Sequence, residues 1–155
     1  SAYAWGRPQG AAVIRSVLVG VDFSTASRQA LERGAAWAGR LGVPLMALHV
    51  LQPPAPMLPE AQIALPDPTW LQSMEQQARE QLAGWVKDLP NAESRVAWGS
   101  PAEELVAACT PETLLIVAQV GHSALARLLF GSTAARVVRH APCDVLVVRA
   151  EEKKD

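Results

Sequence analysis

Five short apolar runs, separated by stretches with helical patterns, constrain the fold of this chain more than any other feature of its sequence. The runs cover residues 16–21, 45–51, 95–98, 114–117 and 145–148, and they consist mainly of aliphatic residues. Strands that are apolar on both faces are typical of parallel sheets with helices on both sides. The alternation of strand and helix therefore predicts right-handed βαβ units in an α/β fold.

Helix signals fill the stretch after the first run and the stretch after the second. Ser24 precedes a predicted helix over 26–41, which Gly42 ends as a C-terminal glycine does. A second amphipathic helix is predicted over 70–89, with Asp67 as its N-cap. Apolar and small residues recur at spacings of three and four in both segments, so each helix is expected to bury one face, which in the first helix includes Trp37.

The second half of the chain carries signals for three shorter helices. Ser100 and Glu103 have the spacing of a capping box, and the helix that they begin is predicted to reach Cys109. A short helical piece is predicted over 124–130 and another helix over 133–140.

Length and composition fit one domain. A chain of 155 residues buries enough surface for a single core. We expect a flexible N-terminal arm over 1–13, the domain over 14–149 and a charged tail over 150–155. Residues 52–69 carry six of the twelve prolines, which predicts a long loop.

Charge and cysteine usage exclude several classes of function. The net charge is -1 and 19% of the residues are charged, so the composition gives no support for binding nucleic acid or a membrane surface. No apolar run approaches the roughly 18 residues that span a bilayer, and no targeting segment is recognisable, which favours a cytoplasmic location. Cys109 and Cys143 lack metal-binding spacing and are expected to be reduced and buried.

Glycines and hydroxyl side chains near the predicted strand ends indicate a phosphate-binding site. Ligands bind open parallel sheets beyond the carboxyl ends of the strands, where Asp22 and the turn from Ala118 to Gly121 are expected to meet. The Asp22 carboxylate can accept hydrogen bonds from a ribose or a base edge. The hydroxyl groups of Ser132 and Thr133 can donate hydrogen bonds to phosphates. The end of the second strand, at His49-Val50, is the nearest apolar slot for adenine.

Each of these residues also has a purely structural interpretation. Asp22 is as suited to capping a helix as to contacting a ligand, and Gly131-Ser132 can end one helix and begin the next. His122 is interpreted as a loop residue rather than a base. Among the arginines of this region we expect Arg127 to contact phosphate, while the others form a solvated helix face.

With these residues in place, the chain resembles the universal stress protein family over about residues 14 to 149. The resemblance rests on Val19-Gly20-Val21-Asp22-Phe23-Ser24, on His49-Val50, on the run from Gly99 to Glu104, and on the closing runs from Leu125 to Ala134 and from His140 to Val148.

The resemblance implies a five-stranded parallel sheet with helices on both faces. This is a doubly wound, adenine nucleotide alpha hydrolase-like fold with strand order 3-2-1-4-5. It also implies a homodimer, which we expect to form through the last strand, because that strand can pair at the sheet edge across a two-fold axis.

One branch of the family binds ATP through a G-x2-G-x9-G-[S/T] pattern. For this chain, the resemblance therefore implies ATP or ADP as the ligand, with or without a bound Mg²⁺ ion. Gly121, Gly131 and Ser132 match this pattern, but Ala118 stands at the first glycine position. If position 118 needs a positive φ, alanine there costs on the order of 1–2 kcal/mol. If the backbone is ordinary, one methyl group is tolerated.

The residues that we expect to contact a nucleotide are Val21, Asp22, Ser24, Val50, Val117, Ala118, Gly121, Arg127, Gly131, Ser132 and Thr133.

Three functions compete at this point. The first is a stress-response protein that binds an adenine nucleotide at the carboxyl ends of the first and fourth strands. The second is a dimeric interaction module of the same family that binds no nucleotide, which Ala118 favours. The third is an enzyme, which the absence of a P-loop, a G-x-G-x-x-G turn and a nucleophile elbow disfavours beyond weak ATP hydrolysis.

Overall fold

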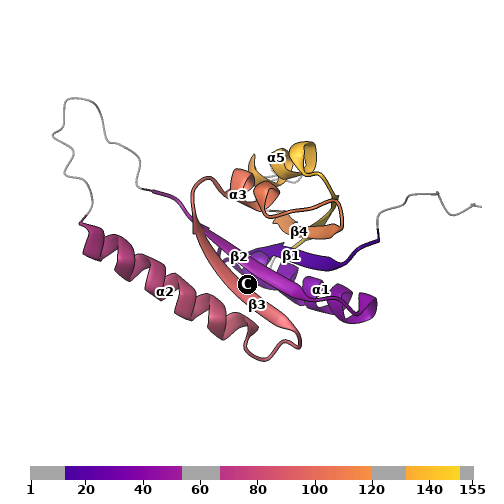
Figure 1. Cartoon of the computed structure of the whole chain (residues 1–155), viewed down its shortest axis with the longest axis horizontal. Coiled ribbons are helices and arrows are strands. Elements are labelled where there is room, and N and C mark those ends of the chain that lie inside the picture. Colours follow the sequence, from indigo (N-terminus) through magenta and orange to yellow (C-terminus); the bar gives the residue numbers. More distant parts are fainter. Residues whose placement is uncertain (1–12, 54–66, 120–131, 151–155) are drawn as a thin grey trace, which may run out of the picture.

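A computed structural model of the chain describes residues 13–53, 67–119 and 132–150. Five parallel strands form one sheet in the order β3-β2-β1-β4-β5 (Figure 1). The strands are β1 (Ser16–Gly20), β2 (Leu45–Leu51), β3 (Ala92–Trp98), β4 (Thr113–Gln119) and β5 (Asp144–Arg149). The predicted fold class and strand order are confirmed.

The described helices cover the two faces of the sheet in pairs. They are α1 (Thr25–Leu41), α2 (Pro68–Val86), α3 (Pro101–Ala107) and α5 (Ser132–His140). Figure 1 shows α3 and α5 together on one side of the sheet, with α1 and α2 on the other. Among these helices none is long and apolar enough to cross a membrane. The helix predicted over 124–130 lies outside the described residues.

Successive strand residues supply two separate buried clusters, one on each face. Val19 and Ile116 belong to the cluster beneath α1 and α2, whereas their neighbours Leu18 and Leu115 belong to the cluster beneath α3 and α5. Side chains alternate between the faces of a strand, so an all-apolar strand fills both clusters. This two-sided burial explains the continuous apolar runs of the sequence.

The predicted signals at the ends of α1 and α2 are confirmed. The Ser24 hydroxyl accepts a hydrogen bond from the Ser27 backbone N–H at 3.1 Å at the start of α1. Gly42 ends this helix in the left-handed conformation, with φ 66°. At α2, the Asp67 carboxylate accepts from the Thr69 N–H at 2.9 Å.

The predicted capping box at α3 is wrong in one respect. Ser100 is the N-cap residue, but its side chain makes no capping hydrogen bond. The acidic side chain that folds back over this helix start is Glu104, because a Cβ built on Gly99 would meet Glu104 Oε1 at 2.7 Å. The Ser100 carbonyl still accepts from the Glu104 N–H at 2.9 Å, so the helix begins where the sequence predicts.

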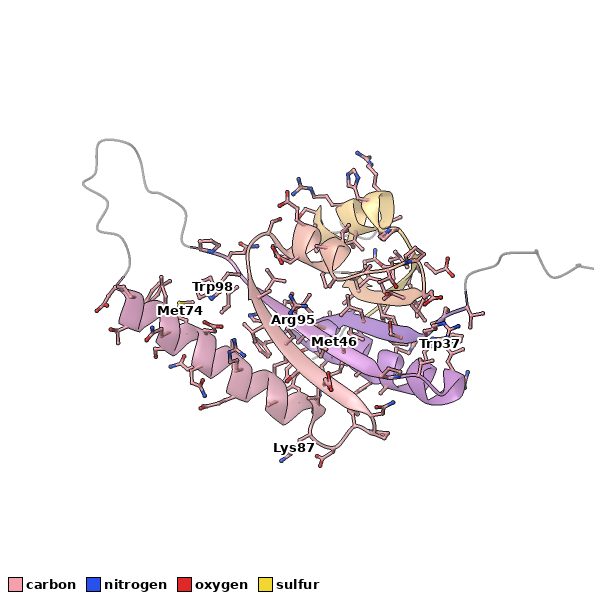
Figure 2. The ribbon with its side chains drawn as sticks, viewed as in Figure 1. Trp37, Met46, Met74, Lys87, Arg95 and Trp98 are labelled. Atoms are coloured by element: carbon pink, nitrogen blue, oxygen red, sulfur yellow. The ribbon has the colours of Figure 1, made fainter. Side chains whose placement is uncertain are left out.

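Two further expectations need correction. The strand predicted over 95–98 begins at Ala92, because pairing with β2 extends to Leu45 while the exposed polar side chains there hide the strand pattern. Trp37, expected on the buried face of α1, is 39% exposed. This helix packs through small residues, and Trp37 lies at its flank with the Arg40 guanidinium 6.0 Å from its ring centroid. Figure 2 shows Trp37 at the opposite end of the molecule from Trp98.

Candidate functional site

A cavity of about 420 Å³ lies at the carboxyl ends of the central strands. Small-molecule sites typically measure roughly 300–1,000 Å³. The described residues that line the cavity come from six elements and the turns next to them: Gly20, Val21, Asp22, Ser27, Leu48, Val50, Gln52, Pro101, Leu105, Val117, Ala118, Ser132, Thr133 and Ala134.

The strand order explains why the cavity forms there. β1 lies between β2 and β4, and the chain leaves β1 toward α1 on one face. The helix that follows β4 among the described residues, α5, packs on the other face. The connections therefore diverge beyond the ends of β1 and β4, and this divergence leaves the crevice in which doubly wound proteins bind ligands.

The turn after β1 is built on the Asp22 carboxylate. Its Oδ1 atom accepts a hydrogen bond from the Ser24 N–H at 2.9 Å and another from the Ser24 hydroxyl. Ser27 is buried, and its hydroxyl accepts from the Asp22 N–H at 3.3 Å and donates to the Ser24 carbonyl at 3.0 Å. Asp22 is thus a turn residue and, at the same time, a lining residue of the cavity.

The hydrogen bonds at this turn also set the charge of Asp22. Partial burial raises the pKa of the carboxyl group, but the bonds from the Ser24 side chain and backbone and from Ser27 outweigh it, so the pKa falls below its ordinary value of 3.8. Asp22 is therefore a carboxylate at neutral pH, suited to accepting hydrogen bonds rather than protons.

An aromatic cluster supports the same turn from the α1 and α2 face. Phe23 has φ 64°, a left-handed conformation that is unusual for a bulky residue. Its ring lies 4.4 Å from that of His49 and 5.3 Å from that of Trp85, centroid to centroid. His49 Nδ1 is 2.7 Å from the Val21 carbonyl oxygen. The tightly packed aromatic side chains hold this strained backbone in place.

His49 and Val50, near the end of β2, face opposite sides of the sheet. Val50 lines the cavity together with Leu48, two residues earlier on the same face. His49 instead points toward Phe23 and does not line the cavity. Of the predicted His49-Val50 slot, only the valine therefore reaches the site.

Ala118 adopts an ordinary strand backbone. It lies within β4, paired with Val148, and the non-glycine residues with positive φ in the described chain are Phe23 and Asn91. Of the two alternatives, the costly left-handed conformation is excluded. Ala118 lines the cavity, but it also packs against the cluster beneath α1 and α2, away from α3 and α5.

The start of α5 closes the cavity on the other side. Ser132 is the first residue of this nine-residue helix, and Ser132, Thr133 and Ala134 all line the cavity. The first N–H groups of a helix lack intrahelical partners and carry partial positive charge. Hydroxyl groups and helix N–H groups together suit an anionic group such as a phosphate.

The structure brings together most of the predicted site residues that it describes. Val21, Asp22, Val50, Val117, Ala118, Ser132 and Thr133 line the cavity. Ser24 does not line it but bonds to Asp22. The predicted residues Gly121, Arg127 and Gly131 lie outside the described residues.

Half of the residues that line the cavity were not predicted from the sequence. The missed residues are Gly20, Ser27, Leu48, Gln52, Pro101, Leu105 and Ala134. Leu48 had a signal, since it precedes Val50 by two residues on the same strand face. Ser27 had one as well, because it follows the N-cap Ser24 by three residues. Pro101 and Leu105 had none, because nothing in the sequence shows that α3 covers this end of the sheet.

The residues described around the cavity would supply a metal ion with one carboxylate ligand. Asp22 is the sole ionisable residue among the described residues of the cavity wall, and the described chain contains no group of three or more potential metal ligands. Mg²⁺ at nucleotide sites is commonly held by one or two carboxylates together with phosphates and water. The site fits that arrangement and does not fit a metal cage made of protein side chains alone.

Comparisons with known proteins agree with this architecture. Residues 14–149 match the model of the universal stress protein family. A universal stress protein of Mycolicibacterium smegmatis is 34% identical over 139 residues, which are 86% of this chain and 45% of that protein. A putative universal stress protein of Staphylococcus aureus strain USA300 is 30% identical, with 89% of this chain and 86% of that protein covered. The chain thus spans less than half the length of the first relative.

Solved structures show the same fold. The universal stress protein UspA from Lactobacillus plantarum aligns with a TM-score of 0.67 and 27% identity, covering 89% of this chain and 99% of that one. A universal stress protein in complex with cAMP gives 0.59 and 26%, covering 90% and 100%. One from Archaeoglobus fulgidus in complex with dAMP gives 0.57 and 17%, covering 86% and 96%.

Proposed function

Because this chain belongs to the universal stress protein family, we propose that it is a stress-response protein that binds an adenine nucleotide, ATP or ADP, at the carboxyl ends of β1 and β4. One observation carries the proposal. A single cavity combines an apolar wall from β2, β4 and α3 with the charged Asp22 and with the hydroxyl-bearing start of α5.

The chemistry of the wall matches the parts of a nucleotide. In the proposed complex the base lies against Val50 and its apolar neighbours, where burial of its ring is favourable. Asp22 accepts hydrogen bonds from the ribose or from the base edge. Ser132 and Thr133 contact phosphates with the help of the α5 N–H groups. On the sequence pattern alone, we add Gly121, Arg127 and Gly131 to the phosphate end.

The nucleotide class is suggested by two relatives. Their structures are complexes with cAMP and with dAMP, both of which are adenine nucleotides. We propose ATP or ADP for this chain because Gly121, Gly131 and Ser132 keep the spacing of the ATP-binding pattern. When Mg²⁺ is bound with such a nucleotide, it neutralises phosphate charge, and Asp22 is the lining residue suited to orient it.

We propose binding rather than catalysis. The pKa of Asp22 is lowered by its hydrogen bonds, although burial acts in the other direction, so this carboxylate is a poor proton acceptor near neutral pH. At most, slow ATP hydrolysis accompanies binding.

The first experiment is denaturation of the freshly purified protein, followed by chromatography of any released adenine nucleotide. Calorimetric titrations with ATP, ADP and cAMP then use the wild type, Asp22→Ala and the control Asp88→Ala, which removes the same charge at an exposed position outside the cavity. We expect Asp22→Ala to weaken binding at least about tenfold and Asp88→Ala to change it less than about twofold. Absence of binding by the wild type at millimolar concentrations of all three nucleotides would contradict the proposal.

A second candidate function, a dimeric interaction module without nucleotide, is favoured by one observation. β5 is the edge strand, and its apolar residues Val145, Leu146 and Val147 are only half-buried in the single chain. An edge strand with free backbone groups pairs readily with a second copy. We therefore propose a homodimer through β5 for either function. Light scattering after size exclusion should give twice the chain mass, and a monomer at tens of micromolar, a concentration typical of weak assemblies, would oppose it.

A further inference from the structure

The two cysteines of this chain lie at one corner of the fold, where the strands of the sheet have their amino-terminal ends. Cys109 follows α3, and Cys143 directly precedes β5. They are the only cysteines in the sequence, and both are free and half-buried. Neither lines the cavity described above.

Strand register brings these residues, which are distant in sequence, to the same corner. Leu114 pairs with Asp144, so Cys143 sits beside the first residue of β4, Thr113. A tight turn joins Cys109 to Thr113. In it, the Thr113 N–H donates to the Thr110 carbonyl at 3.0 Å, and the Thr113 hydroxyl accepts from the Thr110 N–H at 3.0 Å.

The two side chains also share one packing environment. Cys109 and Cys143 both pack against the buried cluster beneath α3 and α5, and each thiol shifts the pKa of the other. The Cys109 thiol also lies 3.2 Å from the Leu105 carbonyl oxygen, to which it donates. Two thiols that strand register brings to one corner and that pack against one cluster are candidates for a disulfide.

The surroundings assign different reactivities to the two sulfurs. Burial, together with the neighbouring Cys143, raises the pKa of the Cys109 thiol to about 12. Burial also raises the pKa of Cys143, and so does the charge of the adjacent Asp144, whereas the Cys109 side chain and the Leu115 backbone act against this rise. Since the thiolate is the nucleophile, Cys143 is the sulfur that reacts first. Both thiols react slowly at neutral pH and faster as the pH rises.

We propose that Cys109 and Cys143 form a reversible intramolecular disulfide in exchange with a low-molecular-weight disulfide such as oxidised glutathione. The Cys143 thiolate attacks one glutathione sulfur, which forms a mixed disulfide and releases one glutathione thiolate. The Cys109 thiolate then attacks the Cys143 sulfur and releases the second. Two protein thiols are oxidised, one glutathione disulfide is reduced, and the two protons pass to the released thiolates.

The bond would join the end of α3 to the start of β5. α3 supplies Pro101 and Leu105 to the cavity wall at the other end of the sheet, and β5 is the edge strand. The oxidised form would thus link covalently two elements that are remote in sequence.

The test incubates the full, reduced chain with excess oxidised glutathione at about pH 8.5, near the ordinary pKa of a thiol. The free-thiol titre should fall from two to zero. Mass spectrometry of the non-reduced digest should show one peptide pair linked through Cys109 and Cys143, with the intact chain lighter by two hydrogens, and dithiothreitol should reverse both changes. Stable glutathione adducts on the cysteines, or links only between chains, would overturn the proposal.

Single variants check the order of the steps. Cys109→Ala should stop at a glutathione adduct on Cys143, whereas Cys143→Ala should leave Cys109 reduced, with an at least tenfold slower reaction. Circular dichroism verifies that each variant is folded. If a variant fails to fold, phenylarsine oxide, whose arsenic binds two adjacent thiols at once, gives an independent result on the wild type. Retention of one equivalent per chain supports the pair, and no retention contradicts it.

Discussion

At the scale of single residues, the side chain of Asp22 serves both the turn and the cavity. Its Oδ1 atom fixes the start of α1 through two hydrogen bonds from Ser24, while Asp22 also lines the cavity. The N-cap of α1 is Ser24 and not Asp22, but Asp22 holds Ser24 in place, so a structural role and a ligand role of Asp22 are compatible in geometry. A substitution at Asp22 should affect stability even without a ligand.

We predict that Asp22→Ala lowers the free energy of unfolding of the ligand-free chain by about 1–2 kcal/mol at neutral pH, because the N-cap Ser24 loses the hydrogen bonds that hold it in place. The pKa of Asp22 is lowered in the folded state, so its contribution is present above the ordinary value of 3.8 and disappears as the pH falls through the folded-state value. Urea unfolding between pH 7 and about pH 3 should show the wild-type advantage shrinking at the acidic end. An advantage that grows as the pH falls would contradict this.

The effect of Ala118 can now be predicted as well. Its backbone is ordinary and its methyl group packs toward α1 and α2, so glycine at this position should change nucleotide affinity by less than about threefold. The same variant should lose about 0.5–1 kcal/mol of stability, because glycine is unfavourable within a strand. Titration of Ala118→Gly with ATP tests the first part. A gain in affinity of tenfold or more would show that the methyl group obstructs the site.

At the scale of elements, α1 approaches the sheet through a glycine. A Cβ built on Gly34 would lie 2.4 Å from Val19 Cγ2, and real Cβ atoms do not approach other atoms so closely. Gly39, in the same helix, is exposed and has nothing within 4 Å of its hypothetical Cβ. The two positions form a matched pair for testing how tightly α1 packs.

Gly34→Ala should therefore destabilise the protein by about 1–3 kcal/mol through overpacking. Gly39→Ala should stabilise it by up to about 1 kcal/mol through helix propensity. Thermal and urea unfolding of both variants measure the contrast. Equal effects of the two substitutions would mean that α1 does not pack as described.

The same scale shows what local sequence can and cannot predict. The starts of α1 and α2 follow from caps that act within three residues, so Ser24 and Asp67 were recognisable. The start of β3 was not, because the exposed Glu93 and Ser94 are held in the sheet by backbone pairing with β2 and not by their side chains. The exposed Trp37 was misplaced for a related reason, since helical spacing does not show how wide the buried face of α1 is.

At the scale of the whole molecule, the site is assembled from segments that are remote in sequence. Strand order alone predicts that the ends of β1 and β4 meet, and seven predicted residues do line one cavity there. The contribution of α3 was not predictable, because it depends on how this helix crosses the sheet. The corner that holds Cys109 and Cys143 was missed for the same reason, since only strand register brings the two together.

The most direct test of the central claim is amide NMR of the ¹⁵N-labelled full chain titrated with ATP. We predict saturable chemical-shift changes at the carboxyl-terminal ends of the strands. The affected residues should be Gly20 to Asp22, Val50, Ala118 and the start of α5. Residues at the amino-terminal ends of the strands, such as Cys109 and Asp144, should not shift and serve as internal controls. Shifts confined to the amino-terminal ends of the strands or to β5 would contradict the claim that this cavity binds an adenine nucleotide. The absence of shifts at millimolar ATP would contradict it as well.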